Sequence, residues 1–241
     1  MSGEFLENLP IILLAAAAGL LGGVVALFWS PKVNARSAIQ HFAAGAVLSA
    51  VASSVIPEAE QFGTVFGILG GFAAGGIAMI VMKWFVVRFE RKEKEKGKLP
   101  LGLAAAAAVD TLVDGALISA GFSSGQQLGT LLAAALALEL LFLTLSVGAE
   151  FRKDKSKTWQ GILVTTGISA LLLLGAFIGN LILRDASEAT IAVGLAFGGA
   201  ALIYLIAEEL LVEAIQAEES LFPTAMLFAG FLVLLALKLL S

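Results

Sequence analysis

Eight long apolar stretches, separated by short polar or turn-forming segments, constrain the fold of this chain more than any other feature. They cover approximately residues 9–30, 37–57, 63–88, 99–122, 126–149, 159–183, 189–214 and 222–240. One helix of about 20 apolar residues crosses the hydrocarbon core of a bilayer. Eight such helices use nearly all of the 241 residues. We therefore expect an all-α integral membrane protein, with residues 1–241 forming a single transmembrane domain.

The composition excludes several other classes of protein. Charged residues make up 14% of the chain, against about 25% in soluble domains. The sequence contains no cysteine, which excludes disulfides and thiolate metal sites, and its net charge of −4 argues against nucleic-acid binding. The sequence has no Ser/His/Asp set, no HExxH helix and no nucleotide-binding glycine loop, so we do not expect an enzyme.

The basic residues predict the orientation of the chain. Because cytoplasmic loops are enriched in Lys and Arg, the face that carries most of them is expected to be cytoplasmic. Only Arg184 and Lys238 lie on the opposite side, so both termini are expected outside the cytoplasm, most simply at the plasma membrane. The other thirteen of the fifteen basic residues lie in or beside the loops after spans one, three and five: Lys32, Arg36, Lys83, Arg88, Arg91, Lys92, Lys94, Lys96, Lys98, Arg152, Lys153, Lys155 and Lys157.

Spans two and seven share a weak internal similarity. Residues 42–59 read FAAGAVLSAVASSVIPEA and residues 197–214 read FGGAALIYLIAEELLVEA, with five identities in eighteen positions. In the orientation above, these two spans cross the membrane in opposite directions. The similarity predicts an inverted repeat of about residues 9–88 and 159–240, with an inserted helix pair at about 99–149, an arrangement typical of transporters. The alternative is that both spans are Ala- and Gly-rich packing helices.

Three acidic residues near the middle of spans four and five carry the strongest functional signal. Asp110 and Asp114 are four residues apart and share a helical face, and Glu139 lies in the next span. Uncompensated, the three ionised carboxylates would cost about 8–10 kcal/mol in the bilayer. No Lys or Arg lies in the interior of any span. Two functional explanations remain for this buried charge, a bound metal cation or bound protons. The alternative is a purely structural role, in which neutral carboxylic acids hydrogen-bond between helices.

Further acidic residues lie nearer the cytoplasmic end of span seven. Glu208 and Glu209 either extend the cation site or reach the membrane interface as a helix cap. The single histidine, His41, opens span two and is more simply an interfacial residue than a ligand. Thr111 adds a hydroxyl oxygen beside Asp110. These donors are all oxygens, which suit Mg²⁺, Mn²⁺ or Fe²⁺ better than an imidazole-rich site does, although zinc also binds carboxylates.

Several of these segments have counterparts in one family. Span two begins Phe42-Ala43-Ala44-Gly45 and ends Pro57-Glu58-Ala59, and span seven carries the acids Glu208, Glu209 and Glu213. Over essentially its whole length the chain resembles the ZIP family (Zrt/Irt-like proteins) of divalent-metal transporters. The family's span-four motif His-Asn-x-Pro-Glu-Gly corresponds to residues 110–115, DTLVDG, and Glu139 stands at the first position of its span-five motif. Both signature histidines are absent, and half of the family's two-metal site is missing.

The resemblance implies a fold and a function. The fold is eight helices in an inverted 3+2+3 arrangement, and the function is movement of a divalent metal toward the cytoplasm by alternating, elevator-type access. The cargo is Zn, Fe or Mn, without a prosthetic group. The metal would bind between spans four and five, with the ligands Asp110, Asp114, Glu139, Thr111, Glu208 and Glu209.

Two other functions remain open on the same fold. One is a proton-coupled carrier of another small solute, in which the carboxylates relay protons. The other is a non-transporting relative that senses metal or acts as a membrane scaffold. The expected partners are a divalent metal ion and the lipid bilayer, and a second copy of the chain in a homodimer is left open.

Overall fold

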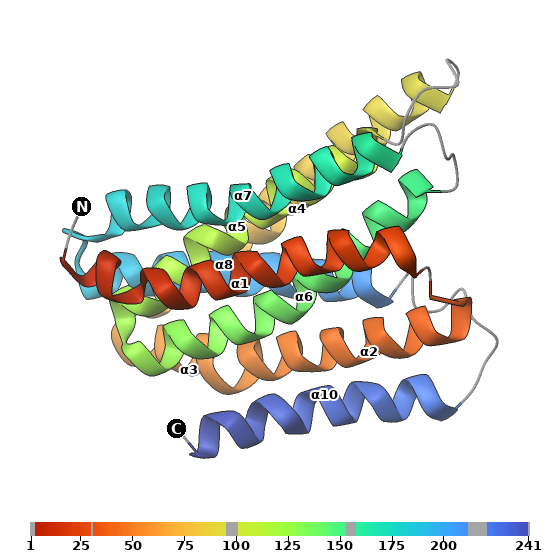
Figure 1. Cartoon of the computed structure of the whole chain (residues 1–241). Helices are drawn as coiled ribbons and strands as arrows, with labels where there is room; N and C mark the ends of the chain where they lie inside the picture. The colour runs from red at the N-terminus through yellow and green to blue at the C-terminus, as the bar shows by residue number, and fades with distance from the viewer. Residues whose placement is uncertain (1–2, 30, 95–100, 153–157, 212–220, 241) are drawn as a thin grey trace.

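The computed structural model describes residues 3–29, 31–94, 101–152, 158–211 and 221–240 (Figure 1). All regular elements within these residues are helical. Eight of the described helical stretches are long and apolar enough to cross a membrane, which confirms the number of spans predicted from the sequence. The boundaries differ by a few residues; the first span begins at Phe5 and the second runs from Val33 to Phe62.

The helices follow one another with short connections. In chain order they are α1 (Gly3–Phe28), α2 (Val33–Ala50), η1 (Val51–Val55), α3 (Ile56–Phe62), α4 (Val65–Lys94), α5 (Leu101–Ser124), α6 (Gln126–Arg152), α7 (Thr158–Leu183), α8 (Glu188–Leu205), η3 (Ile206–Leu210) and α10 (Leu221–Leu240). The π-helical turns η1 and η3 interrupt the second and seventh spans. Successive spans alternate in direction, so both termini lie at one end of the bundle and α1, α4 and α6 end at the other (Figure 1).

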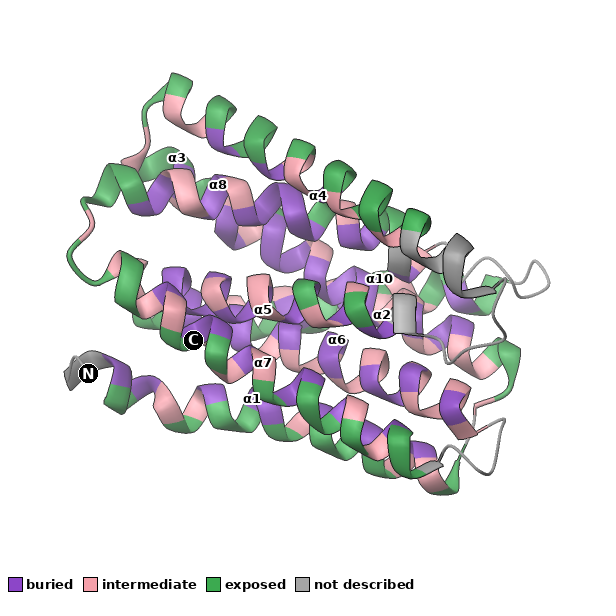
Figure 2. Ribbon diagram, turned by 90° about the horizontal axis from the view of Figure 1, so that it is seen from above, coloured by how far each residue is buried: buried purple, intermediate pink, exposed green. Residues whose placement is uncertain are grey.

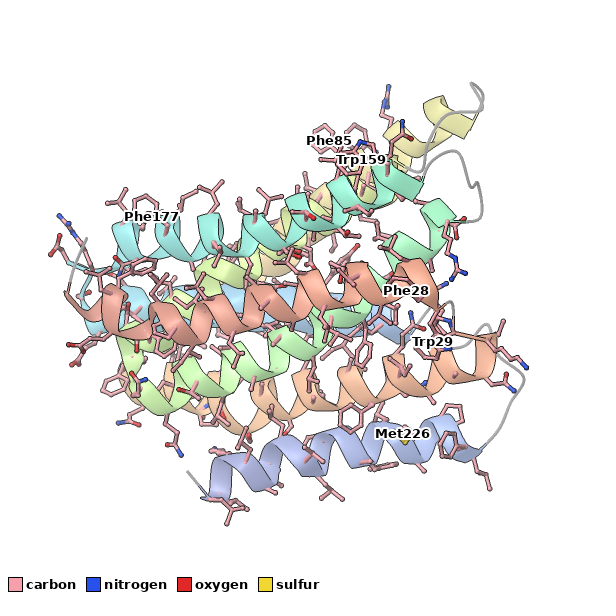
Figure 3. All side chains as sticks on the ribbon, in the orientation of Figure 1. Phe28, Trp29, Phe85, Trp159, Phe177 and Met226 are labelled. Atoms are coloured by element: carbon pink, nitrogen blue, oxygen red, sulfur yellow. The ribbon has the colours of Figure 1, made fainter. Side chains whose placement is uncertain are left out.

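The end of the bundle opposite to the termini has the composition of a membrane interface. Figure 3 labels Trp29, Phe85 and Trp159 at this end, and the side chains of Trp29, Trp84 and Trp159 are all exposed. The Arg88 guanidinium lies over the Trp84 ring, 5.3 Å from its centroid. Tryptophan and basic residues concentrate where a bilayer meets water. We refer to this end as the basic end.

Small residues let the helices of the bundle approach closely. The principal neighbours are α1 with α6, α5 with α7, α2 with α10, and α4 with α8. At the crossing of α5 and α7, a Cβ atom on Gly115 would strike the Leu172 carbonyl, and one on Gly175 would strike the Leu112 carbonyl. Since lipid tails give no hydrophobic drive between helices, such close contacts are what hold them together.

The peripheral and central helices are clearly distinguished by burial. Only 17% of the residues in the spans of α4 and α10 are buried, against 39–61% in the other six described spans. Figure 2 shows the buried residues on the facing sides of the helices and the exposed ones along the outer side of α4. The spans of α5 and α6, which carry the acidic residues predicted to bind a cation, are each 56% buried and so belong to the core of the bundle.

Candidate metal centre

Asp110, Asp114 and Glu139 come together in the core. One oxygen atom of each carboxylate lies within 4.8 Å of the corresponding atoms of the other two. All three side chains are buried, with 2%, 3% and 2% of their surfaces exposed. Carboxylate oxygens coordinate Mn²⁺, Fe²⁺, Zn²⁺ or Ca²⁺ at about 2.0–2.6 Å, so two ligands of one ion are separated by at most about 4–5 Å. The spacing suits a single cation.

Contacts on the far sides of α5 and α6 fix the helices that carry these carboxylates. Directly after Asp114, Gly115 packs its backbone on the Leu172 carbonyl of α7. Five residues after Glu139, the Thr144 hydroxyl donates to the Gly19 carbonyl of α1 at 2.7 Å. Each acidic helix is thus held against an outer neighbour close to its acid, which limits how far the carboxylates can move apart.

Thr111 lies beside Asp110 and is fully buried. Its hydroxyl donates to the Ala107 carbonyl of its own helix at 2.7 Å. This back-bonding is usual for threonine inside a helix, and it leaves the oxygen lone pairs for another donor or a cation. The hydroxyl proton is therefore directed away from any ion that the oxygen would bind.

A cavity of about 190 Å³ adjoins Glu139 on the side of the basic end. It lies between α2, α5, α6, α8 and η3, and its polar lining residues are Gln40, Glu139, Ser146 and Glu208. Apolar side chains, among them Phe142 and Leu143, form the remaining wall. The cavity connects the level of the buried carboxylates with the level of Glu208.

Toward the end that carries the termini, the described helices enclose a second, much smaller pocket. This pocket, of about 20 Å³, lies between α1, α5 and α7, with the polar lining residues Asn8, Ser119, Ser123 and Asn180. The Phe5 and Phe177 rings meet edge to face there, with centroids 6.1 Å apart. This pocket has about a tenth of the volume of the cavity beside Glu139.

Among the acidic residues of span seven, Glu208 lies apart from this cluster. Glu208 is on η3 and accepts a hydrogen bond from the Lys83 ammonium of α4. The acidic group close enough to share one ion, among the residues that the structure describes, comprises Asp110, Asp114 and Glu139 without Glu208. Glu209 also lies on η3, while Glu213 falls outside the described residues. His41 Nδ1 donates a hydrogen bond to the Ser37 carbonyl at 2.8 Å.

Sequence reasoning missed two residues that line the cavity and one that contacts its wall. Ser146 lies seven residues after Glu139 and so on the same face of α6, a spacing that could have identified it. Gln40 is a buried polar residue near the start of an apolar span. Lys83 counts only as one of the basic residues of the cytoplasmic face in the sequence, and nothing in the sequence pairs it with Glu208.

No protein-family model matches this chain, and no curated protein matches it.

Proposed function

We propose that this protein is a ZIP-like carrier that moves a divalent metal cation toward the cytoplasm by alternating access. The observation that carries the proposal is the buried group of Asp110, Asp114 and Glu139, which adjoins a cavity on the side of the basic end. A carrier needs a central site that is accessible from one face at a time. With the basic end in the cytoplasm, this conformation is the inward-facing one.

The π-helical turns support an inverted repeat. When residues 42–59 of span two are aligned with residues 197–214 of span seven, residue 51 corresponds to residue 206. In that alignment, η1 (Val51–Val55) and η3 (Ile206–Leu210) coincide residue for residue. The two spans run in opposite directions (Figure 1). π-Helical turns are rare, so their coincidence supports the repeat more strongly than the five sequence identities do.

Contacts of the third helix of each repeat follow the same correspondence. A Cβ atom on Gly75 of α4 would strike the Phe197 carbonyl of α8, and one on Gly230 of α10 would strike the Phe42 carbonyl of α2. Gly75 and Gly230 are as far apart in sequence as Phe42 and Phe197. The same close approach between the two halves therefore occurs twice, once through the third helix of each repeat.

The central helices make a further pair of similar contacts, here with Gly22 and Gly175 separated by 153 positions instead of 155. A Cβ atom on Gly175 of α7 would strike the Leu112 carbonyl, two residues after Asp110, and one on Gly22 of α1 would strike the Leu141 carbonyl, two residues after Glu139. Asp110 and Glu139 thus occupy corresponding positions on α5 and α6. Two halves of opposite direction give inward- and outward-facing states of similar energy, and the carboxylates lie where the halves meet.

The donor set indicates the class of cargo. Every candidate ligand offers oxygen, which suits a hard or borderline divalent cation such as Mn²⁺, Fe²⁺ or Zn²⁺. The ion is the transported substrate. Asp110 and Asp114 stand where the family has its span-four histidine and glutamate, so we propose the family's route of transport with a weaker preference for zinc.

Uptake into proteoliposomes tests the proposal. Vesicles containing the purified chain should accumulate ⁵⁴Mn²⁺ down its gradient, and empty vesicles should not. Because the chain has no cysteine, single cysteines at the exposed positions Lys32 and Thr64 report orientation through an impermeant thiol reagent. Mn²⁺-independent proton flux would indicate the proton-coupled carrier instead, and metal binding without flux would indicate a sensor.

Replacing Asp110 with histidine should shift the selectivity toward zinc. Imidazole is a softer ligand than carboxylate and favours Zn²⁺ over Mn²⁺. Binding by Asp110→His should also weaken between about pH 7 and 5.5, because imidazole must lose its proton to bind a metal. Competition of Zn²⁺ against Mn²⁺ on the wild type and the variant measures this change. An unchanged ratio of the two affinities would show that residue 110 does not contact the ion.

A further inference from the structure

A lysine contacts each of the two π-helical turns. Lys83 of α4 donates to the Glu208 carboxylate of η3, and Lys238 of α10 donates to the Ser53 carbonyl of η1. Lys83 and Lys238 correspond to one another in the proposed repeat, as do Glu208 and Ser53. The two contacts are therefore versions of one arrangement at opposite ends of the bundle.

The contact at Ser53 has a local cause in the backbone. Four residues later comes Pro57, which has no N–H group, so the Ser53 carbonyl lacks the donor that an α-helix would supply. The Lys238 ammonium donates to this carbonyl. A neutral carbonyl is thus sufficient to hold the lysine against a π-helical turn, and the arrangement does not itself require a carboxylate.

Glu208, the residue that Lys83 contacts at the basic end, faces the cavity through which the cation would leave. Glu208 lines the same cavity as Glu139, and these two are the acidic residues among its described lining. With a volume of about 190 Å³, the cavity has room for several water molecules beside an ion. An ion that leaves Glu139 with its water therefore next meets Glu208 as the strongest ligand on its way.

We propose that Lys83 is a positioning residue for cation release: its ammonium engages Glu208 and keeps this carboxylate from retaining the departing ion. The inference rests on the proposed function, in which the cavity is the exit. A divalent ion and the Lys83 ammonium compete for the same oxygen atoms of Glu208. Because the ammonium is tethered to α4, its local concentration at Glu208 is high. Without Lys83, Glu208 becomes a second cation site at the mouth of the cavity.

Mn²⁺ binding to the full chain in detergent tests the proposal without any transport. The electron paramagnetic resonance signal of hydrated Mn²⁺ measures the free ion, and the background is Asp110→Asn/Asp114→Asn, which removes two of the central ligands. In this background Lys83→Met should raise Mn²⁺ affinity about five- to tenfold, a modest gain because the ion pair is exposed. Lys83→Gln serves as a second variant if Lys83→Met does not fold.

Two further variants make the test specific. Adding Glu208→Gln to Lys83→Met should abolish the gain in affinity, and Lys238→Met, the corresponding change next to a neutral carbonyl, should not produce one. Equal gains from Lys83→Met and Lys238→Met, or a gain that survives Glu208→Gln, would overturn the proposal.

Transport supplies an independent readout. With Asp110 and Asp114 intact, Lys83→Met should lower kcat and KM for uptake together, because the ion is held at the exit, and Glu208→Gln should restore kcat. If Lys83 had a purely structural role, kcat and KM would not fall together in Lys83→Met, and Glu208→Gln would not restore kcat. If wild-type vesicles take up no Mn²⁺, the carrier proposal fails, whereas the binding series still decides whether Lys83 shields Glu208.

Discussion

Asp110→Asn and Asp114→Asn should each lower the affinity for Mn²⁺ by about 100-fold. Each substitution keeps the shape of the side chain but removes a full ligand charge, and a loss of about 2.8 kcal/mol corresponds to that factor. Calorimetry or the Mn²⁺ resonance signal measures the affinity on purified protein. Uptake into vesicles should fall in parallel, because the same carboxylates would carry the ion in transport.

The same two variants should be at least as stable as the wild type. Three buried carboxylates confined within 4.8 Å repel one another when they are ionised. Removing one charge should therefore leave the melting temperature in metal-free buffer unchanged or higher. Glu60→Gln, which neutralises an exposed acid on α3, is the matched control and should retain wild-type affinity. Wild-type affinity in both aspartate variants would refute the proposed site.

Gly75→Leu should destabilise the bundle severely, while Gly76→Leu should be tolerated. A side chain at Gly75 meets the Phe197 backbone of α8, whereas a Cβ atom at Gly76 has no described atom within 4 Å. Backbone atoms cannot yield as a flexible side chain can, so α4 must separate from α8. We expect the melting temperature in detergent to fall by about 10 °C or more for Gly75→Leu.

The two glycines are neighbours on one helix, so hydrophobicity and helix propensity change equally in both variants. Thermal unfolding followed by size-exclusion chromatography compares them directly. Equal melting temperatures for Gly75→Leu and Gly76→Leu would mean that α4 does not pack on α8 through the glycine face.

The sequence was sufficient to predict the eight spans and the acidic cluster. Hydropathy over about 20 residues reflects the thickness of a bilayer, so the number of spans follows from composition along the chain alone. Asp110 and Asp114 share a face through the helical repeat, and adjacent antiparallel helices bring Glu139 to the same depth. These inferences need only local geometry and the connection between neighbouring spans.

Other parts of the site depend on contacts between distant segments. The pairing of Lys83 with Glu208 joins residues 125 positions apart, and no local pattern specifies it. The cavity arises from the shapes of side chains on α2, α5, α6 and η3 together. The π-helical turns follow partly from Pro57 in the second span, but η3 has no proline within its five residues, so its geometry depends on tertiary packing.

The pairing of α2 with α10 has a consequence for the biogenesis of this protein. Backbone atoms of α2 at Gly45 and of α10 at Leu227 approach so closely that a Cβ atom on Gly45 would strike the Leu227 carbonyl. Helices enter the bilayer in chain order and assemble afterwards. The face of α2 that packs on α10 therefore stays in contact with lipid until α10 has been inserted. A chain that ends before α10 leaves this face of α2 exposed to lipid.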